Sequence, residues 1–156
     1  MSTEPLHSLR YVDDVTRDDV LALEAFIYSQ LRPVQDAAGE TGDTFCALRS
    51  LEILVCDSAG LLLALLDRVG QGQEERSTML REWNRLWTTA SWWNCRDGYD
   101  SDRWNRLEHV DAAAEASHRA ENARAQAAAG GVLVKGATAV RTWRIETVRR
   151  LLRRGG

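Results

Sequence analysis

The segment from Asp43 or Thr44 to about Val69 constrains the fold most strongly, because its pattern predicts a helix that is apolar around more than half of its circumference. Asp43 or Thr44 would be its N-cap, and Gly70 is suited to its C-cap. The apolar positions are Leu48, Leu51, Leu54, Val55, Leu61, Leu62, Leu65 and Leu66. Such a helix is expected at the centre of a bundle, where neighbours cover most of its sides.

Two more helices are expected, one before this segment in the sequence and one after it. The first begins at Thr16, which is a good N-cap residue, and Pro33 should kink or end it. The next extends from about Glu74 to Arg96. Its inward face consists of Met79, Leu80, Trp83, Leu86, Trp87, Ala90 and Trp93, which recur at helical spacing.

A fourth helix is expected to begin at Ser101 and to continue through the alanine-rich residues 112–129. Its main apolar anchors would be Trp104, Leu107 and Val110. Glycines at 130 and 131 stop it, and Gly136 precedes a final helix over residues 137–153. The expected fold class is therefore all-α: an irregular four-helix bundle with an additional basic C-terminal helix after a glycine hinge.

The length of 156 residues fits one domain. We expect the chain to consist of an irregular N-terminal arm (1–15), the helical bundle (16–131) and the basic C-terminal helix (132–156). The chain carries a formal charge of −3, but residues 132–156 contain seven basic side chains and one acidic side chain. This tail is therefore at +6 and the rest of the chain at −9, so the helix is expected to pack on the bundle or on a neighbouring subunit.

Five of the six tryptophans fall between residues 83 and 104, and Trp92 differs from the others. On the helix expected there, it lies on the polar face among Arg81, Arg85 and Arg96. This arrangement suits a protein-interface anchor or a base-stacking platform beside phosphate-binding arginines. The alternative is that Trp92 packs beneath the N-terminal arm or the C-terminal tail.

The final helix has an apolar side and a cluster of cations in its last turns. The residues concerned are Trp143, Val148, Leu151 and Leu152 on the apolar side, and Arg149, Arg150, Arg153 and Arg154 in the cluster. Such a tail can hold nucleic acid, an anionic membrane surface or an acidic protein partner. Because the body of the chain is itself acidic, docking on the same or an identical chain is the preferred interpretation.

One charged pair is expected inside the bundle. Glu24 interrupts the apolar stripe of the first helix, and Arg49 belongs to the narrow polar strip of the second, together with Glu52. Buried charges must be paired, so a contact between Glu24 and Arg49 is expected. The alternative is a polar cavity for a ligand at this position.

The sequence predicts no metal, cofactor or catalytic group. Glu115 and His118 have the Glu-x-x-His spacing of di-iron bundles, but that site requires a second such motif, which the sequence lacks. The segment from Gly131 to Thr138 lacks the Ser or Thr that follows the lysine of a phosphate-binding loop. No nucleophile elbow is recognisable either.

The compartment expected is the bacterial cytoplasm. Nineteen of the twenty basic residues are arginine, a bias typical of GC-rich genomes, and the three cysteines form no C-x-x-C motif. The first ten residues do not have the pattern of a secretory signal. The longest apolar run has eight residues, against about 20 for a membrane span.

The function expected is that of a non-enzymatic interaction protein, which associates with itself or another subunit through the Trp-rich helix and the C-terminal helix. A nucleic-acid-binding accessory protein is the alternative, with the basic tail and the Trp/Arg surface as its contacts. A third possibility is a helical bundle that binds or converts a small molecule.

Overall fold

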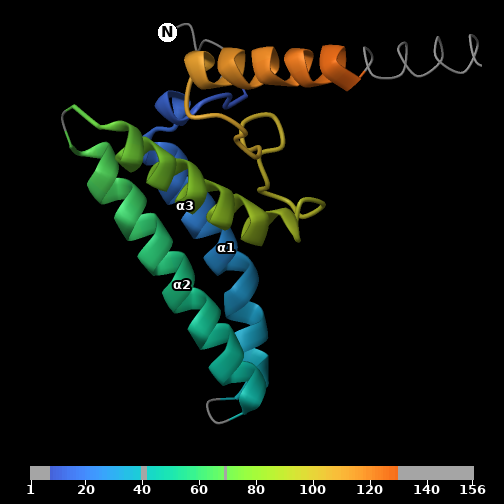
Figure 1. The fold of residues 1–156 in the computed structure, drawn as a ribbon. Coiled ribbons are helices and arrows are strands. Elements are labelled where there is room, and N and C mark those ends of the chain that lie inside the picture. The colour runs from blue at the N-terminus through green and yellow to red at the C-terminus, as the bar shows by residue number, and fades with distance from the viewer. Residues whose placement is uncertain (1–7, 40–41, 69, 130–156) are drawn as a thin grey trace, which may run out of the picture. The chain divides into compact units, whose positions relative to one another are not determined.

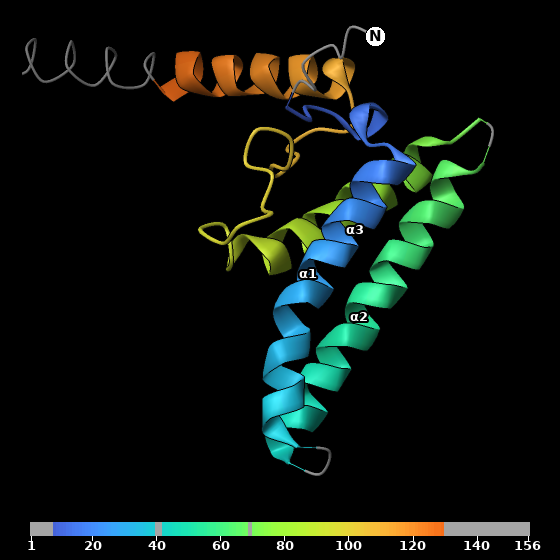
Figure 2. The same ribbon diagram turned by 180° about the vertical axis from the view of Figure 1, so that it is seen from behind.

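The computed structural model describes residues 8–39, 42–68 and 70–129, and within these ranges it contains helices and no strand. A 3-10 turn, η1 (Val12–Asp14), precedes α1 (Arg17–Ala38), α2 (Asp43–Leu66) and α3 (Gln73–Ser91), and residues 112–129 are also helical (Figures 1 and 2). The all-α expectation is confirmed. The expected glycine hinge and basic C-terminal helix lie outside the described residues.

The chain divides into two compact units, which are residues up to Glu115 and residues from Ala116 onward. In the described part of the second unit, every residue from 116 to 129 is exposed. This stretch is therefore a helix without a buried face of its own, as its alanine-rich composition suggests. The hydrophobic core lies in the first unit.

Helix α1 begins as the sequence predicts. The Thr16 hydroxyl accepts a hydrogen bond from the Asp19 backbone N–H at 3.2 Å, and the Asp19 carboxylate accepts one from the Thr16 N–H at 2.8 Å. Pro33, however, does not end the helix, which continues to Ala38. Its missing N–H costs one intrahelical bond, and α1 contacts α2 on both sides of Pro33, through Tyr28 and Gln35, which each donate to Glu52 at 3.5 Å.

Helix α2 lies beside α1 and is not the covered centre of the bundle. One face is buried, through Val55, Ser58, Ala59, Leu62 and Leu65. The opposite face is open, with exposed fractions of 51% for Ile53, 60% for Leu54 and 42% for Leu61. The expectation of a central helix was wrong, because α2 buries a single face against α1 and α3 and its other face stays exposed.

That segment, residues 104–110, is irregular although its apolar residues are buried as anchors. Asn84 of α3 donates to the Leu107 carbonyl at 2.8 Å and accepts from the Leu107 N–H at 2.9 Å. The Trp83 indole N–H donates to the Asn105 carbonyl at 2.9 Å. These tertiary bonds satisfy the backbone without a helix, and the helix starts only after Asp111, whose carboxylate caps it through the Ala114 N–H at 2.7 Å.

The N-terminal arm contributes to the core. Leu9, Val12 and Val15 are buried, and the arm's backbone joins the later segment through bonds from the Leu9 N–H to the Arg103 carbonyl and from the Val12 N–H to the Val110 carbonyl, both at 3.2 Å. Apart from η1, the described residues of the arm are irregular, as expected. Three apolar residues among 8–15 are too few for a periodic signal in the sequence.

The exposure of α2 changes which leucines should matter for stability. We expect Leu54→Ala to change the free energy of unfolding by less than about 0.5 kcal/mol, because Leu54 is 60% exposed. Leu62→Ala should cost about 2 to 5 kcal/mol, because Leu62 is fully buried and its removal leaves a cavity. Urea denaturation at a concentration where the chain is monomeric measures both. Equal losses would contradict the open face of α2.

Candidate interaction surface

A groove runs between α2 and α3 and encloses about 320 Å³. Its lining residues are Leu51, Leu54, Val55, Ser58, Arg85, Leu86 and Thr89. The α2 wall is apolar apart from Ser58, while Arg85 and Thr89 give the α3 wall a polar edge. An apolar floor with a polar edge is typical of a surface that receives a protein segment.

Helix α3 is amphipathic, and its polar face forms one edge of the groove. Met79, Trp83, Leu86 and Ala90 are buried against the core, which leaves Arg81 and Arg85 at the surface with side chains about 60% exposed. The helix begins after Gly72, whose N–H donates to the Glu75 carboxylate at 3.0 Å.

The carboxylate of Glu82 lies beneath these two arginines and is only 3% exposed. It accepts hydrogen bonds from Ser58 at 3.0 Å, from Arg81 Nε at 3.0 Å and from Arg85 Nη1 at 2.8 Å. Burial acts to raise its pKa, but the bonds from Arg81 and Ser58 and the charge of Arg85 outweigh burial and lower the pKa below its ordinary value. Glu82 is therefore ionised, and two guanidinium groups share one carboxylate.

Trp92 is the exposed tryptophan of this surface, with 81% of its area accessible. It follows α3 directly and keeps a helical backbone (φ −64°, ψ −19°), so it continues the line of Arg85 and Thr89 one turn further. Of the other tryptophans that the structure describes, Trp83 and Trp104 are buried and Trp87 and Trp93 are half-buried. An indole that is exposed to this extent is typical of an interface anchor.

The helical spacing that the sequence suggested for Arg96 and Trp92 is not present. Helix α3 ends at Ser91, five residues before the predicted end, so the helical wheel that placed Arg96 beside Trp92 does not apply. Turns follow, with the Arg96 N–H bonded to the Trp93 carbonyl at 2.9 Å. Within the described residues, the guanidinium that lies over an aromatic ring is that of Arg10, 5.3 Å from the ring centre of Tyr11, and Trp92 has no such partner.

The remaining predicted interface residues lie outside the described residues. These are Trp143, Val148, Arg149, Arg150, Leu151, Leu152, Arg153 and Arg154. The groove residues of α2 were not singled out from the sequence as an interface. Their signal was present in the apolar circumference of α2, but it was interpreted as burial.

The expected pair of Glu24 and Arg49 is not formed. Arg49 pairs with Glu52, one turn along the same helix, and its side chain is 60% exposed. The Glu24 carboxylate instead accepts a hydrogen bond from the Tyr28 hydroxyl at 3.2 Å. The antiparallel course of α1 and α2 explains this result, since Tyr28 reaches the Glu52 carbonyl at 3.5 Å and Glu24 lies a turn further from Arg49.

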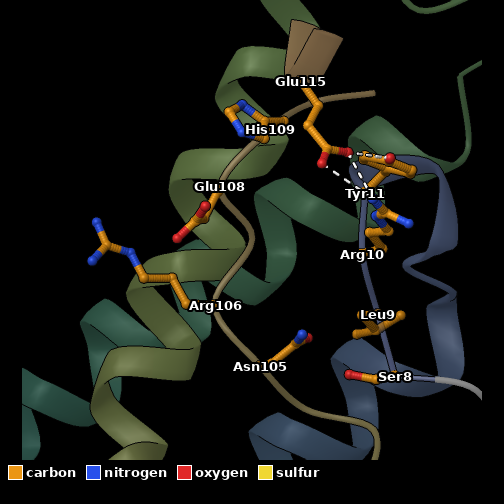
Figure 3. Close-up of a pocket in the computed structure, with 9 residues that line it drawn as sticks. All are labelled: Ser8, Leu9, Arg10, Tyr11, Asn105, Arg106, Glu108, His109 and Glu115. Atoms are coloured by element: carbon orange, nitrogen blue, oxygen red, sulfur yellow. Dashed lines mark hydrogen bonds and ion pairs between the residues drawn. The ribbon is translucent and has the colours of Figure 1, made fainter. Parts of the chain in front are cut away.

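A second hollow of about 310 Å³ lies between residues 8–11 and 105–109 (Figure 3). Arg10 donates to both oxygens of Glu115 at 3.1 and 3.0 Å, and the Tyr11 hydroxyl donates to the same carboxylate. The hydrogen bond and charge of Glu115 raise the pKa of Arg10. Arg106 and Glu108 point away from this cluster in Figure 3. Spacing along the sequence gave no signal of the cluster, because its members are about 105 residues apart.

Glu115 is thus committed to Arg10 and Tyr11, which is not the role that a di-iron motif would give it. His118 lies 3.3 Å from the Asn122 amide in the second unit. Among the described residues, no three His, Cys, Asp or Glu side chains cluster as metal ligands. Nor does any helix of this part of the chain have the length and apolar character of a membrane span.

Comparison with known proteins gives no relative from which a role can be carried over. No family model, curated protein sequence or solved structure matches the chain.

Proposed function

We propose that this chain is a non-enzymatic helical interaction protein that associates with itself through the groove between α2 and α3. The observation that carries the proposal is a groove of about 320 Å³ that is lined by the 60% exposed Leu54, together with the 81% exposed Trp92 at the end of α3, the helix that forms the other wall. Large apolar side chains are costly to leave in water, and they are common anchors of protein interfaces.

The charge distribution supports a copy of the same chain as the partner. Residues 1–115 contain 11 basic and 21 acidic side chains, and residues 116–156 contain 9 basic and 2 acidic ones. Opposite charges on one chain favour the encounter of two copies. The C-terminal residues Val148, Leu151 and Leu152 remain part of this proposal on sequence grounds.

The alternative function, nucleic-acid binding, gains little from the described surface. Arg81 and Arg85 both bond to the ionised Glu82, so together they offer one net positive charge where the sequence suggested two. Phosphate binding through Trp92 and these arginines is therefore weakened, and the alternative depends on the basic tail.

We expect Leu54→Ala and Trp92→Ala each to weaken self-association by about tenfold or more, because Leu54 lines the groove and Trp92 is an exposed indole at the end of α3, which forms one of its walls. Sedimentation equilibrium over a range of concentrations measures the effect. Leu21→Ala is the matched control for Leu54→Ala, since Leu21 is also an exposed leucine (42%) but lies on α1 and does not line the groove.

Two results would overturn the proposal. One is a wild-type chain that stays monomeric at millimolar concentration. The other is a chain that retains nucleic acid during purification, with an affinity that falls steeply with salt and is unchanged by Trp92→Ala, which would favour the alternative function.

A further inference from the structure

The open face of α2 contains a line of residues seven positions apart. Ala47, Leu54 and Leu61 are all exposed, and seven residues make two turns of an α-helix. A line with this spacing is the seam along which two helices pack side by side in a coiled coil. In α2 the seam faces solvent.

The two sides of this seam differ in charge. On one side, Leu51 and Ser58 lead into the groove and to Arg85 of α3. On the other side lie Ser50 and Asp57, by the helical spacing relative to Leu54. Asp57 is exposed and forms no ion pair with another described residue. The seam therefore has a carboxylate on one side and a guanidinium on the other.

The guanidinium side has an unbalanced positive charge. Arg81 and Arg85 share the single carboxylate of Glu82, which is ionised, and the Arg85 side chain is 61% exposed beside the groove. One further carboxylate at this position would balance the local charge. Arg85 lines the groove together with Leu54 and Ser58, so it lies at the level of Asp57 along α2.

We infer that a second copy of this chain packs on α2 in parallel, about a two-fold axis that runs along the line of Ala47, Leu54 and Leu61. Such an axis exchanges the two sides of the seam and keeps the level along the helix. It therefore brings Asp57 of each copy to Arg85 of the other, twice in the dimer. Leu54 and Leu61 of the two copies form the apolar centre. This inference rests on the proposed self-association and names the partner and its register.

The test uses two charge-reversal variants of the full chain, Asp57→Arg and Arg85→Glu, alone and mixed. Each variant alone places like charges opposite each other twice, so we expect it to associate about tenfold more weakly than the wild type. In the mixture, the cation introduced by Asp57→Arg in one copy faces the carboxylate introduced by Arg85→Glu in the other. The unchanged Asp57 and Arg85 face each other as well, so the mixed dimer should regain the wild-type affinity. Sedimentation velocity with one variant fluorescently labelled, at low ionic strength, measures all three.

Arg85→Glu also places a second carboxylate beside the buried Glu82, so Arg85→Gln is the second variant if the first does not fold. A mixture of Asp57→Arg with Arg85→Gln should associate more tightly than Asp57→Arg with itself, because two repulsive contacts are replaced by one neutral and one attractive contact. Asp36→Arg on α1, exposed and away from the seam, controls for the change in net charge and should leave the affinity unchanged.

The outcomes separate this inference from the proposed function. If mixing gives no gain while Trp92→Ala still weakens self-association, the parallel register is wrong and the proposed function stands. If the wild-type chain does not associate at all, both are wrong. The inferred register is supported if affinity recovers in the mixture but not in either variant by itself, and if Asp36→Arg has no effect.

Discussion

Replacement of Trp83 by alanine is expected to lower the free energy of unfolding by about 3 to 5 kcal/mol, the largest effect of any tryptophan of α3. Trp83 is fully buried in the core, and its indole N–H donates to the Asn105 carbonyl at 2.9 Å. The substitution therefore leaves a large cavity and removes the donor that holds the irregular segment. Urea denaturation followed by far-ultraviolet circular dichroism measures the change.

Trp92, directly after the same helix, gives a matched comparison. Trp92→Ala should change the stability of the monomer by less than about 0.5 kcal/mol, because its side chain is 81% exposed. At the buried position, Trp83→Phe separates the loss of apolar volume from the loss of the hydrogen bond, since it keeps most of the volume and removes the indole N–H. Similar losses for Trp83→Ala and Trp92→Ala would contradict the assignment of one to the core and the other to the surface.

Removal of Arg103 is expected to cost a similar amount, about 3 to 5 kcal/mol, because it leaves the carboxylate of Asp19 buried without its partner. Arg103 Nε and Nη2 donate to the two oxygens of Asp19 at 2.8 and 2.7 Å, and Nη2 also donates to the Asp14 carbonyl at 3.1 Å. Arg103→Ala in thermal or urea denaturation tests this expectation. Arg17→Ala is the control, because Arg17 and Asp67 form an exposed pair that should contribute less than about 1 kcal/mol.

The buried pair of Asp19 and Arg103 also makes the stability of the fold depend on pH. Burial acts to raise the pKa of Asp19, but the bonds from Arg103 and Thr16 prevail and lower the pKa below its ordinary value of 3.8. Because the folded pKa is below the unfolded one, the contribution is complete at neutral pH, and it is lost as the pH falls from about 4 through the folded pKa. Asp19→Asn should therefore flatten the acid limb of a plot of stability against pH. An unchanged acid limb would show that other carboxylates control it.

Local signals in the sequence predicted much of the fold. Thr16 and its capping partners gave the start of α1, and the polar segments around Gly42 and Gly72 separated three helices close to their observed bounds. The burial of Trp83 followed from helical spacing. These features depend on residues a few positions apart, where propensity and periodicity act directly.

The features that the sequence did not predict depend on contacts over long separations. Leu107 and Val110 have helical spacing, yet the segment is irregular because Asn84 and Trp83 bond to its backbone from α3. The apolar circumference of α2 could not distinguish a helix at the centre of one chain from a helix with a face left open. The exposure of Trp92 was predicted, but its position at the end of α3 was not, because helix ends depend on capping and packing together.

The bonds that fix residues 104–110 have a consequence for how this chain can vary. Trp83 and Asn84 bond to main-chain atoms of Asn105 and Leu107, and Val12 of the N-terminal arm bonds to the Val110 carbonyl, so the path of the segment does not depend on the segment's own polar side chains. Arg106 and Glu108, both exposed, can therefore be exchanged for other residues while the backbone keeps its course. This stretch is a site where evolution, or an engineer, can introduce new side-chain chemistry onto the scaffold without refolding it.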